Sequence, residues 1–397
     1  MSNVYEAIRV SDRVYWVGAI DWTIRNFHGY LTERGTTYNA YLIKGSHSNI
    51  LVDTVKRPFL DEMLARVSSV VEPSSIDTIV SHHAELDHSG CLPVVAGLVA
   101  PKRVLTSRAG IDALANHFDL DVPIESVTDG APTEIGDVQL TFHETKMLHW
   151  PESMVSFLSG DNVLFSQDGF GMHLASQERW TDLLSADVVN RETAKYFANI
   201  LMPMAGPVGK VLNKLAPIVP SIKVIANDHG PIWRTGIPDI LEKYKTWAER
   251  TPSKKVVVVY ATMWQSTASM ARAIAEGAAS GGVRVELMSL ESSHRSDIAT
   301  ELLDAGALLV GTPNLNGQMY PTVADLLTYL KGLKPKGLVG AAFGSYGWSP
   351  SAIEQVNAAL DDCKVKRVRE PLGAKYVPSH EELRSCHDLG KMVADLL

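Results

Sequence analysis

The feature that most constrains this chain is a short run of potential metal ligands directly after a predicted buried strand. The alternation His83-x-Glu85-x-Asp87-His88 follows the apolar residues of the strand predicted at 76–80. Loops at strand ends are where α/β proteins carry much of their chemistry. Imidazole and carboxylate ligands without a thiolate favour iron, manganese or zinc. The alternative is a polar loop on a solvated surface, and residues further along the chain argue against it.

Three single residues later in the chain lie in similar settings. His149 lies in a loop before Pro151, Asp168 follows a predicted strand at 163–167, and His229 lies in the turn after another at 222–226. Each alone is more typical of a structural residue. Together with the motif they supply what a site for two metal ions needs, with Asp168 as the candidate bridging carboxylate.

This pattern resembles the metallo-β-lactamase superfamily, whose strand-end motif is His-x-His-x-Asp-His. Glu85 replaces the second histidine of that motif, and this replacement is similar to the flavodiiron proteins. A hard carboxylate suits iron that cycles between the ferrous and ferric states, whereas imidazoles alone suit redox-inert zinc.

Length and composition predict a two-domain protein of a reducing compartment. The chain has 397 residues, 45% of them hydrophobic, which is enough for two or three domains. Cys91, Cys363 and Cys386 are scattered, so neither a disulfide framework nor a rubredoxin or iron–sulfur module is expected. A net charge of −8 argues against nucleic acid as a partner. We see no secretory signal and no membrane-spanning apolar run, and expect a cytoplasmic protein.

A polar, Pro-containing stretch at 248–255 predicts the domain boundary, with domains over residues 1–250 and 254–397. The fold class is α/β. In the first domain, strands and helical segments come in the order expected of an αββα sandwich. In the second, the continuous apolar run at 256–259 is typical of a central parallel strand, and the pattern predicts a doubly wound parallel sheet of five strands.

Three loops of the second domain are expected to meet at the carboxyl edge of this sheet, where doubly wound folds bind ligands. Hydroxyls in the first loop, which opens a helix, would seat an anion, although an ordinary helix cap is the simpler alternative. No Gly-x-Gly-x-x-Gly dinucleotide motif is present. The loops resemble those of flavodoxin, so FMN is the expected cofactor. Its predicted contacts are Thr262, Met263, Trp264, Gln265, Ser266, Thr267, Pro313, Asn314, Leu315, Asn316, Gly317, Ser345, Tyr346, Gly347 and Trp348.

The resemblance covers essentially the whole chain, which is similar to the minimal, class A flavodiiron proteins: a metallo-β-lactamase-like diiron domain followed by a flavodoxin-like domain. It implies that His83, Glu85 and His149 hold one iron. It also implies that Asp87, His88 and His229 hold the other, with Asp168 bridging; His88 is a ligand in only some family members. The family further implies a head-to-tail homodimer or homotetramer that sets one chain's FMN beside the other's irons.

Some residues near the implied site depart from the family pattern. The family commonly has a tyrosine where Phe197 stands, so either a phenol is missing or the neighbouring Tyr196 fills its role. Gln167 replaces a smaller polar residue before Asp168. His28 and His173 are candidates for the substrate pocket, and the alternative for each is a packed or surface histidine. His82 is expected either at the surface or behind the ligands.

The implied reaction is reduction of O2 to water, of NO to N2O, or of both. The electron donor implied is rubredoxin, reduced deazaflavin F420 or an NADH-linked reductase. Two alternatives stay open at this point. One is a metallo-β-lactamase-type hydrolase with a regulatory flavodoxin domain, acting through a metal-bound hydroxide. The other is an electron carrier with an inactive metal site.

Overall fold

The computed structural model describes residues 4–397 and divides into two compact units. The N-terminal unit comprises Met1–His28, Thr32–Tyr196 and Gly206–Lys245. The C-terminal unit comprises Gly29–Leu31, Phe197–Ala205 and Thr246–Leu397. Each unit has its own sheets and its own hydrophobic core, and each is described by itself below.

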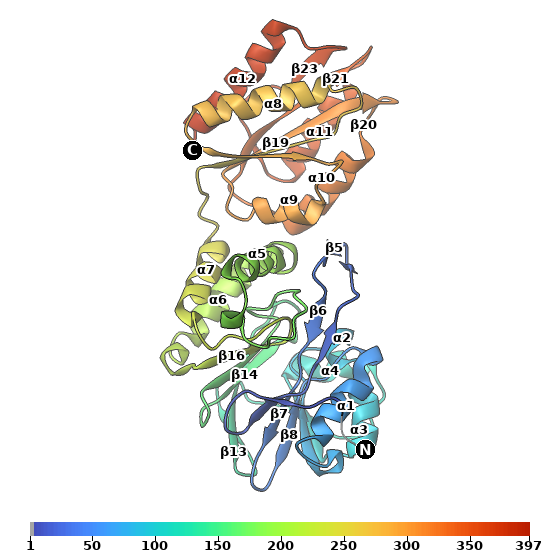
Figure 1. Cartoon of the computed structure of the whole chain (residues 1–397), viewed down its shortest axis with the longest axis vertical. Helices are drawn as coiled ribbons and strands as arrows, with labels where there is room; N and C mark the ends of the chain where they lie inside the picture. The colour runs from blue at the N-terminus through green and yellow to red at the C-terminus, as the bar shows by residue number, and fades with distance from the viewer. Residues whose placement is uncertain (1–3) are drawn as a thin grey trace. The chain divides into compact units, whose positions relative to one another are not determined.

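Two sheets face each other in the N-terminal unit (Figure 1). The first has the order β1 (Ile8–Arg9), β2 (Val14–Trp16), β7 (Tyr41–Lys44), β8 (Asn49–Val52), β9 (Ile76–Val80), β10 (Arg103–Thr106) and β11 (Ile124–Ser126). The second has the order β12 (Pro132–Ile135), β13 (Val138–Glu144), β14 (Met154–Leu158), β15 (Val163–Gln167) and β16 (Val224–Asn227). The short strands are β3 (Ala19–Asp21), β6 (Thr36–Tyr38) and β4 (Asn26–Phe27), with β5 (Tyr30–Leu31) in the C-terminal unit.

Alternation along the strands explains this arrangement, because successive side chains of a strand point to opposite faces. Ile43 and Ile50 of the first sheet pack with Phe142 and Phe165 of the second in one core between the sheets. Leu42 and its neighbours face outward and pack against helices in a second core. The helices that lie wholly or mainly in this unit are α1 (Leu60–Ser68), α2 (Leu86–Ser89), α3 (Leu92–Val99), α4 (Arg108–His117), α5 (Ala186–Tyr196), α6 (Ala205–Leu215) and α7 (Ile237–Glu249).

The C-terminal unit is a parallel sheet between two layers of helices (Figure 1). Its main order is β18 (Arg284–Ser289), β17 (Lys255–Tyr260), β19 (Ala307–Leu315), β21 (Val339–Tyr346) and β22 (Lys366–Arg367), with β20 (Gln318–Met319) and β23 (Leu372–Lys375) added at its ends. Helices α8 (Ser266–Ser280) and α12 (His380–Asp395) pack on one face. The other helices are α9 (Arg295–Glu301), α10 (Pro321–Leu333) and α11 (Ser351–Asp362). Numbered along the chain, the five main strands run 2-1-3-4-5, the flavodoxin-like order.

The predicted fold class is confirmed: an αββα sandwich is followed by a doubly wound parallel sheet. Within residues 4–397, no helix combines the length and the apolar character needed to cross a membrane.

Candidate metal centre and flavin pocket

The predicted metal-binding motif lies where β9 ends and the short helix α2 begins. His83 and Glu85 precede the helix, whereas Asp87 and His88 lie within it. The backbone amides of His88 and Ser89 both donate to the carbonyl of Glu85, which fixes the turn. This change from extended chain to helix lets alternate residues of the motif converge on one place.

A first group of four side chains comes together around Glu85. Glu85 Oε2 lies 3.2 Å from His83 Nε2 and 3.1 Å from His149 Nε2. Asp168 Oδ2 lies 3.2 Å from His149 Nε2 and 3.7 Å from His83 Nε2. One potential ligand atom from each of these residues lies within 4.8 Å of all the others, which is the spacing of a metal site.

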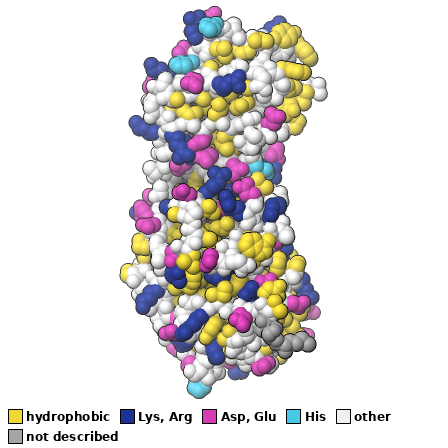
Figure 2. Space-filling view, viewed as in Figure 1, with side chains coloured by type: hydrophobic (Ala, Val, Ile, Leu, Met, Phe, Trp, Pro, Cys, Tyr) yellow, Lys and Arg dark blue, Asp and Glu magenta, His cyan; other side chains and the backbone are white. Residues whose placement is uncertain are grey.

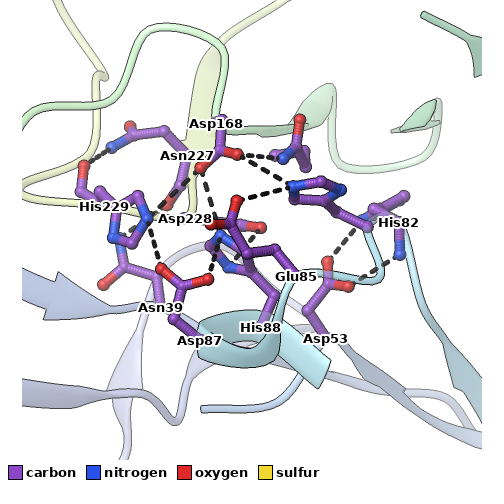
Figure 3. Close-up of polar contacts among 12 residues, drawn as sticks. Asn39, Asp53, His82, Glu85, Asp87, His88, Asp168, Asn227, Asp228 and His229 are labelled. Carbon is purple, nitrogen blue, oxygen red and sulfur yellow. Dashed lines mark hydrogen bonds and ion pairs between the residues drawn. The ribbon is translucent and has the colours of Figure 1, made fainter. Parts of the chain in front are cut away.

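A second group forms beside the first from Asp87, His88 and His229. Asp87 Oδ2 lies 3.3 Å from His229 Nε2, and Asp87 Oδ1 lies 3.4 Å from His88 Nε2. The other oxygen of Asp168, Oδ1, lies 3.3 Å from His88 Nε2 and 3.4 Å from His229 Nε2. Figure 3 shows Asp168 above the side chains of Glu85, Asp87 and His88. A single carboxylate therefore offers one oxygen to each group.

Several polar atoms of these residues have no hydrogen-bond partner among residues 4–397, which tests whether a pair of metal ions fits the site. Both oxygens of Asp87, both ring nitrogens of His88 and Asp168 Oδ1 are buried without a hydrogen-bond partner among residues 4–397. Buried polar atoms in native proteins are rarely left in this way. Two cations between the groups would satisfy those of these atoms that face the site, which are the oxygens of Asp87, His88 Nε2 and Asp168 Oδ1, so the residues fit a two-metal site.

The pKa shifts of the ligand side chains also favour bound cations. Burial alone would lower the pKa of His149, but its hydrogen bonds with Asp168 and Glu85 outweigh burial and raise that pKa to about 10. Burial would raise the pKa of Asp168, yet the neighbouring His88 and His149 hold it well below its ordinary value. The converging carboxylates thus demand positive charge, which metal ions supply when they displace the imidazole protons.

Contacts behind the ligands orient the imidazoles, and the sequence pattern did not reveal them. His83 Nδ1 lies 2.8 Å from Glu152 Oε1, and His229 Nδ1 lies 2.8 Å from the carbonyl oxygen of Thr37. His88 Nδ1 lies 3.4 Å from Asp228 Oδ2. Such partners fix which ring nitrogen faces the metal. The only sequence signal was proximity, since Glu152 lies three residues after His149 and Asp228 directly precedes His229.

His82 is not a surface residue, so that part of the expectation is wrong. Its side chain is fully buried, with Nδ1 2.6 Å from Asp53 Oδ2 and Nε2 2.9 Å from Ser156 Oγ. Its backbone amide also donates to Asp53 Oδ1. Figure 3 shows the pair of His82 and Asp53 to one side of the metal-binding residues. This network anchors the motif between the two sheets.

The pocket candidates separate into residues that contact the site and one that lies elsewhere. The ring of Tyr196 packs 5.1 Å from that of His173 and 6.0 Å from that of His229, between centroids, and burial together with the nearby Asp168 raises the pKa of its phenol well above the ordinary value. His173 packs 4.9 Å from His229, between ring centroids, and His28 Nε2 lies 3.0 Å from Glu85 Oε1. Phe197 packs against Trp247 instead, with 5.2 Å between ring centroids. The phenol at the site is therefore that of Tyr196.

The C-terminal unit contains a cavity of about 250 Å³ at the carboxyl edge of its sheet. All three predicted loops contribute to its lining, which comprises Met263, Trp264, Ser266, Pro313, Asn314, Ser345, Tyr346, Gly347, Tyr376 and Val377. Figure 2 shows hydrophobic side chains gathered at the end of this unit where β21 and β23 terminate. A flat aromatic ligand suits such a lining.

The anion end of this cavity lies at the start of α8. The residue before the helix, Gln265, has a left-handed conformation (φ 68°), and no side chain caps the first turn. The exposed amides of a helix start attract phosphate. Thr262 Oγ1 is buried without a hydrogen-bond partner in residues 4–397, whereas the hydroxyls of Thr267 and Ser345 lie 2.8 Å apart. The cavity therefore fits FMN.

Some predicted flavin contacts do not line the cavity, and two lining residues were missed. Those outside the lining are Thr262, Gln265, Thr267, Leu315, Asn316, Gly317 and Trp348. Trp348 is 89% exposed, and Trp264, which does line the cavity, is 90% exposed. Tyr376 and Val377 follow β23, a strand with only one buried residue, so its weak hydrophobic pattern gave no signal for the loop.

Comparison with known proteins agrees with both sites. The family model described as ODP family beta lactamase matches residues 36–230, and the flavodoxin model matches residues 258–390. A nitric oxide reductase of Moorella thermoacetica is 41% identical over 98% of both chains. A rubredoxin-oxygen oxidoreductase of Megalodesulfovibrio gigas is 38% identical over 99% of this chain and 98% of its own.

A solved structure extends the match to three dimensions. The flavodiiron protein from Giardia intestinalis is 31% identical and superposes with a TM-score of 0.94, covering 98% of this chain and 96% of its own. Fold, metal-binding groups and flavin pocket thus agree with matches that span nearly the full length. The chain belongs to the flavodiiron protein family.

Proposed function

We propose that this protein is an oxidoreductase that reduces O2 to water, NO to N2O, or both, at a non-haem diiron site supplied with electrons by FMN. The observation that carries the proposal is the bridging position of Asp168, whose two oxygens face two separate ligand groups. The names of the two relatives, one for nitric oxide and one for oxygen, support the same chemistry.

We assign the first iron to His83, Glu85 and His149, and the second to Asp87, His88 and His229, with Asp168 shared. The division follows the two groups that the structure brings together. Inclusion of His88 rests on its Nε2, which points into the second group, and on Asp228 behind its Nδ1. Each iron would then have imidazole and carboxylate ligands, the mixture that suits ferrous and ferric iron.

When bound, the irons supply ferrous centres that bind a diatomic molecule, and FMN supplies electrons. Tyr196 keeps its proton, since its pKa lies well above the ordinary value, and can donate a hydrogen bond at the site. His173 stays neutral, because burial and then the nearby His229 lower its pKa well below the ordinary value. We infer that His28, which is largely exposed and contacts Glu85, admits or orients the substrate.

The hydrolase alternative is wrong, because relatives that match nearly the whole chain are named oxidoreductases. The alternative of an electron carrier with an inactive metal site has little support, since both ligand groups are complete. Glu85 occupies the place at which a zinc hydrolase would carry a histidine.

The partners and the assembly extend this proposal. We propose an electron donor of the rubredoxin, F420H2 or NADH-linked reductase type, a cytoplasmic location, and domains over residues 1–250 and 254–397. We also propose a head-to-tail homodimer or homotetramer. This assembly is the one that membership of the family implies, and each cofactor site is built from one unit alone.

The proposed function is tested by the cofactor content and by rapid mixing. Protein produced with adequate iron should contain two irons and one FMN per chain, measured by elemental analysis and by absorbance of the released flavin. Anaerobically reduced protein is mixed separately with O2 and with NO. At least one of the two gases should reoxidise the flavin as fast as the enzyme turns over. Two zinc ions without iron, or a reduced flavin that is stable toward both gases, would refute the proposal.

Replacement of the tyrosine hydroxyl should slow turnover without loss of cofactors. Tyr196→Phe removes the phenol hydroxyl that we propose as a hydrogen-bond donor at the site, where Tyr196 packs against His173 and His229. A hydrogen bond to a charged species contributes about 1.5–3 kcal/mol. If it forms only in the transition state, the rate should fall by about one to two orders of magnitude. Stopped-flow turnover with O2 and NO measures the effect, with iron content as the check on assembly.

Phe197→Tyr is the matched comparison, because it adds a hydroxyl one position along the chain. The contact between Phe197 and Trp247 predicts that both rates stay within about twofold of the parent. A changed ratio of O2 to NO turnover would instead show that a phenol at position 197, where the family commonly has a tyrosine, acts on the substrate. Unchanged rates in Tyr196→Phe would exclude the role proposed for the phenol.

A further inference from the structure

Gln167 stands beside the proposed bridging carboxylate in an unusual backbone conformation. It is the last residue of β15, has a φ of +53°, and its side chain is fully buried. The pairing of β15 with β16 shifts register between Phe165 and Gln167. In a regular strand, neighbouring residues point to opposite faces. The shift and the left-handed φ remove that alternation, so Gln167 and Asp168 both reach the metal-binding groups.

The amide of Gln167 contacts one oxygen of Asp168. Its Nε2 donates a hydrogen bond to Asp168 Oδ2. Only the nitrogen end of the amide can face a carboxylate, because its oxygen is an acceptor. The oxygen end, Oε1, is buried and has no hydrogen-bond partner among residues 4–397. The contact with Asp168 is therefore the polar interaction that this side chain makes.

This contact lies on one side of the proposed bridge. Asp168 Oδ2 is the oxygen that faces His149 and His83, at 3.2 and 3.7 Å from their Nε2 atoms. Oδ1 faces the second group and receives no hydrogen bond from residues 4–397. A donor on a ligand oxygen draws electron density away from the metal and changes its reduction potential. Ferric iron depends on an anionic oxygen more than ferrous iron does.

We propose that Gln167 is a positioning residue that makes the two irons unequal, raising the reduction potential of the iron held by His83, Glu85 and His149. This inference rests on the proposed diiron function. The hydrogen bond from Gln167 weakens Asp168 Oδ2 as a donor to that iron and so favours its ferrous state. The iron held by Asp87, His88 and His229 keeps the full donor strength of Oδ1. The first iron is thereby the one held ready for a diatomic substrate.

The test is a redox titration of the holoenzyme carrying Gln167→Met, which keeps the length of the side chain but removes the donor. Mössbauer and electron paramagnetic resonance spectra distinguish the two irons. At a fixed potential, the ferric-to-ferrous ratio of one iron should rise about tenfold, as loss of a hydrogen bond to a charged group implies. This corresponds to a fall of about 59 mV for a one-electron couple. The second iron and the flavin should titrate as in the parent.

The proposal is overturned if both irons keep the reduction potentials of the parent, or if both potentials shift by the same amount. If Gln167→Met binds fewer than two irons, Gln167→Leu is titrated in its place. If both variants lose iron, Gln167 is needed to assemble the iron pair, and the proposal that it sets the reduction potential is overturned. Failure of the proposed function is distinguishable, because the parent itself would then lack the iron pair.

Discussion

Asp168→Ala should yield a folded protein that binds FMN but no longer assembles two irons. Asp168 is buried and is the one carboxylate with an oxygen toward each ligand group. Its removal leaves two adjacent cations without the shared negative charge that offsets their repulsion. Both groups also lose a ligand at the same time. The parent should contain two irons per chain, whereas the variant should contain no iron pair and should not turn over O2 or NO.

The measurements are elemental analysis for iron, flavin absorbance, and turnover with each gas. The flavin should persist, because the cavity at the start of α8 is built from the C-terminal unit alone. Asp182→Ala is a matched control, since Asp182 pairs with Arg234 at the surface of the N-terminal unit. The control should keep both irons. Retention of two irons and normal turnover in Asp168→Ala would refute the ligand assignment.

Mixing two inactive variants should restore activity if electrons pass between chains. Asp168→Ala provides a chain with FMN and no iron pair. Ser266→Asp provides a chain with the iron pair and no FMN. Ser266 lines the cavity and is the first residue of α8, where a carboxylate would repel the phosphate of FMN. Aspartate near a helix N-terminus is favourable for the helix, so this variant should fold. In a mixed head-to-tail dimer, one flavin–diiron pair out of two is complete.

Free exchange of subunits makes half of the dimers mixed, so activity should recover to about one quarter of the parent's. Subunit exchange is followed with differently tagged chains, and turnover of O2 or NO is measured after mixing. Each variant mixed with itself is the control and should stay inactive. Absence of recovery despite demonstrated exchange would exclude transfer between chains. The Ser266→Asp protein must also retain two irons, which elemental analysis checks.

The sequence by itself determined where the chemistry would lie. A run of ligands after an apolar strand placed His83 and Glu85 at a strand end, and the structure has them there. The flavin loops were predictable for a similar reason, because parallel strands bring their carboxyl ends to one edge of the sheet. Both are local patterns of apolar and polar residues, which a single sequence displays directly. The family resemblance added the identity of the metal and of the cofactor.

Only the tertiary structure decided which distant residues meet and which neighbour faces the site. Glu152 and Asp228 carry no pattern that predicts a contact with His83 or His88, since such contacts depend on how the two sheets pack. The choice between Tyr196 and Phe197 depends on helix phase, because adjacent helical residues point in different directions. Here α5 ends at Tyr196 and a π-helical turn, Phe197–Leu201, follows. The ring of Tyr196 packs against His173 and His229, whereas that of Phe197 packs against Trp247.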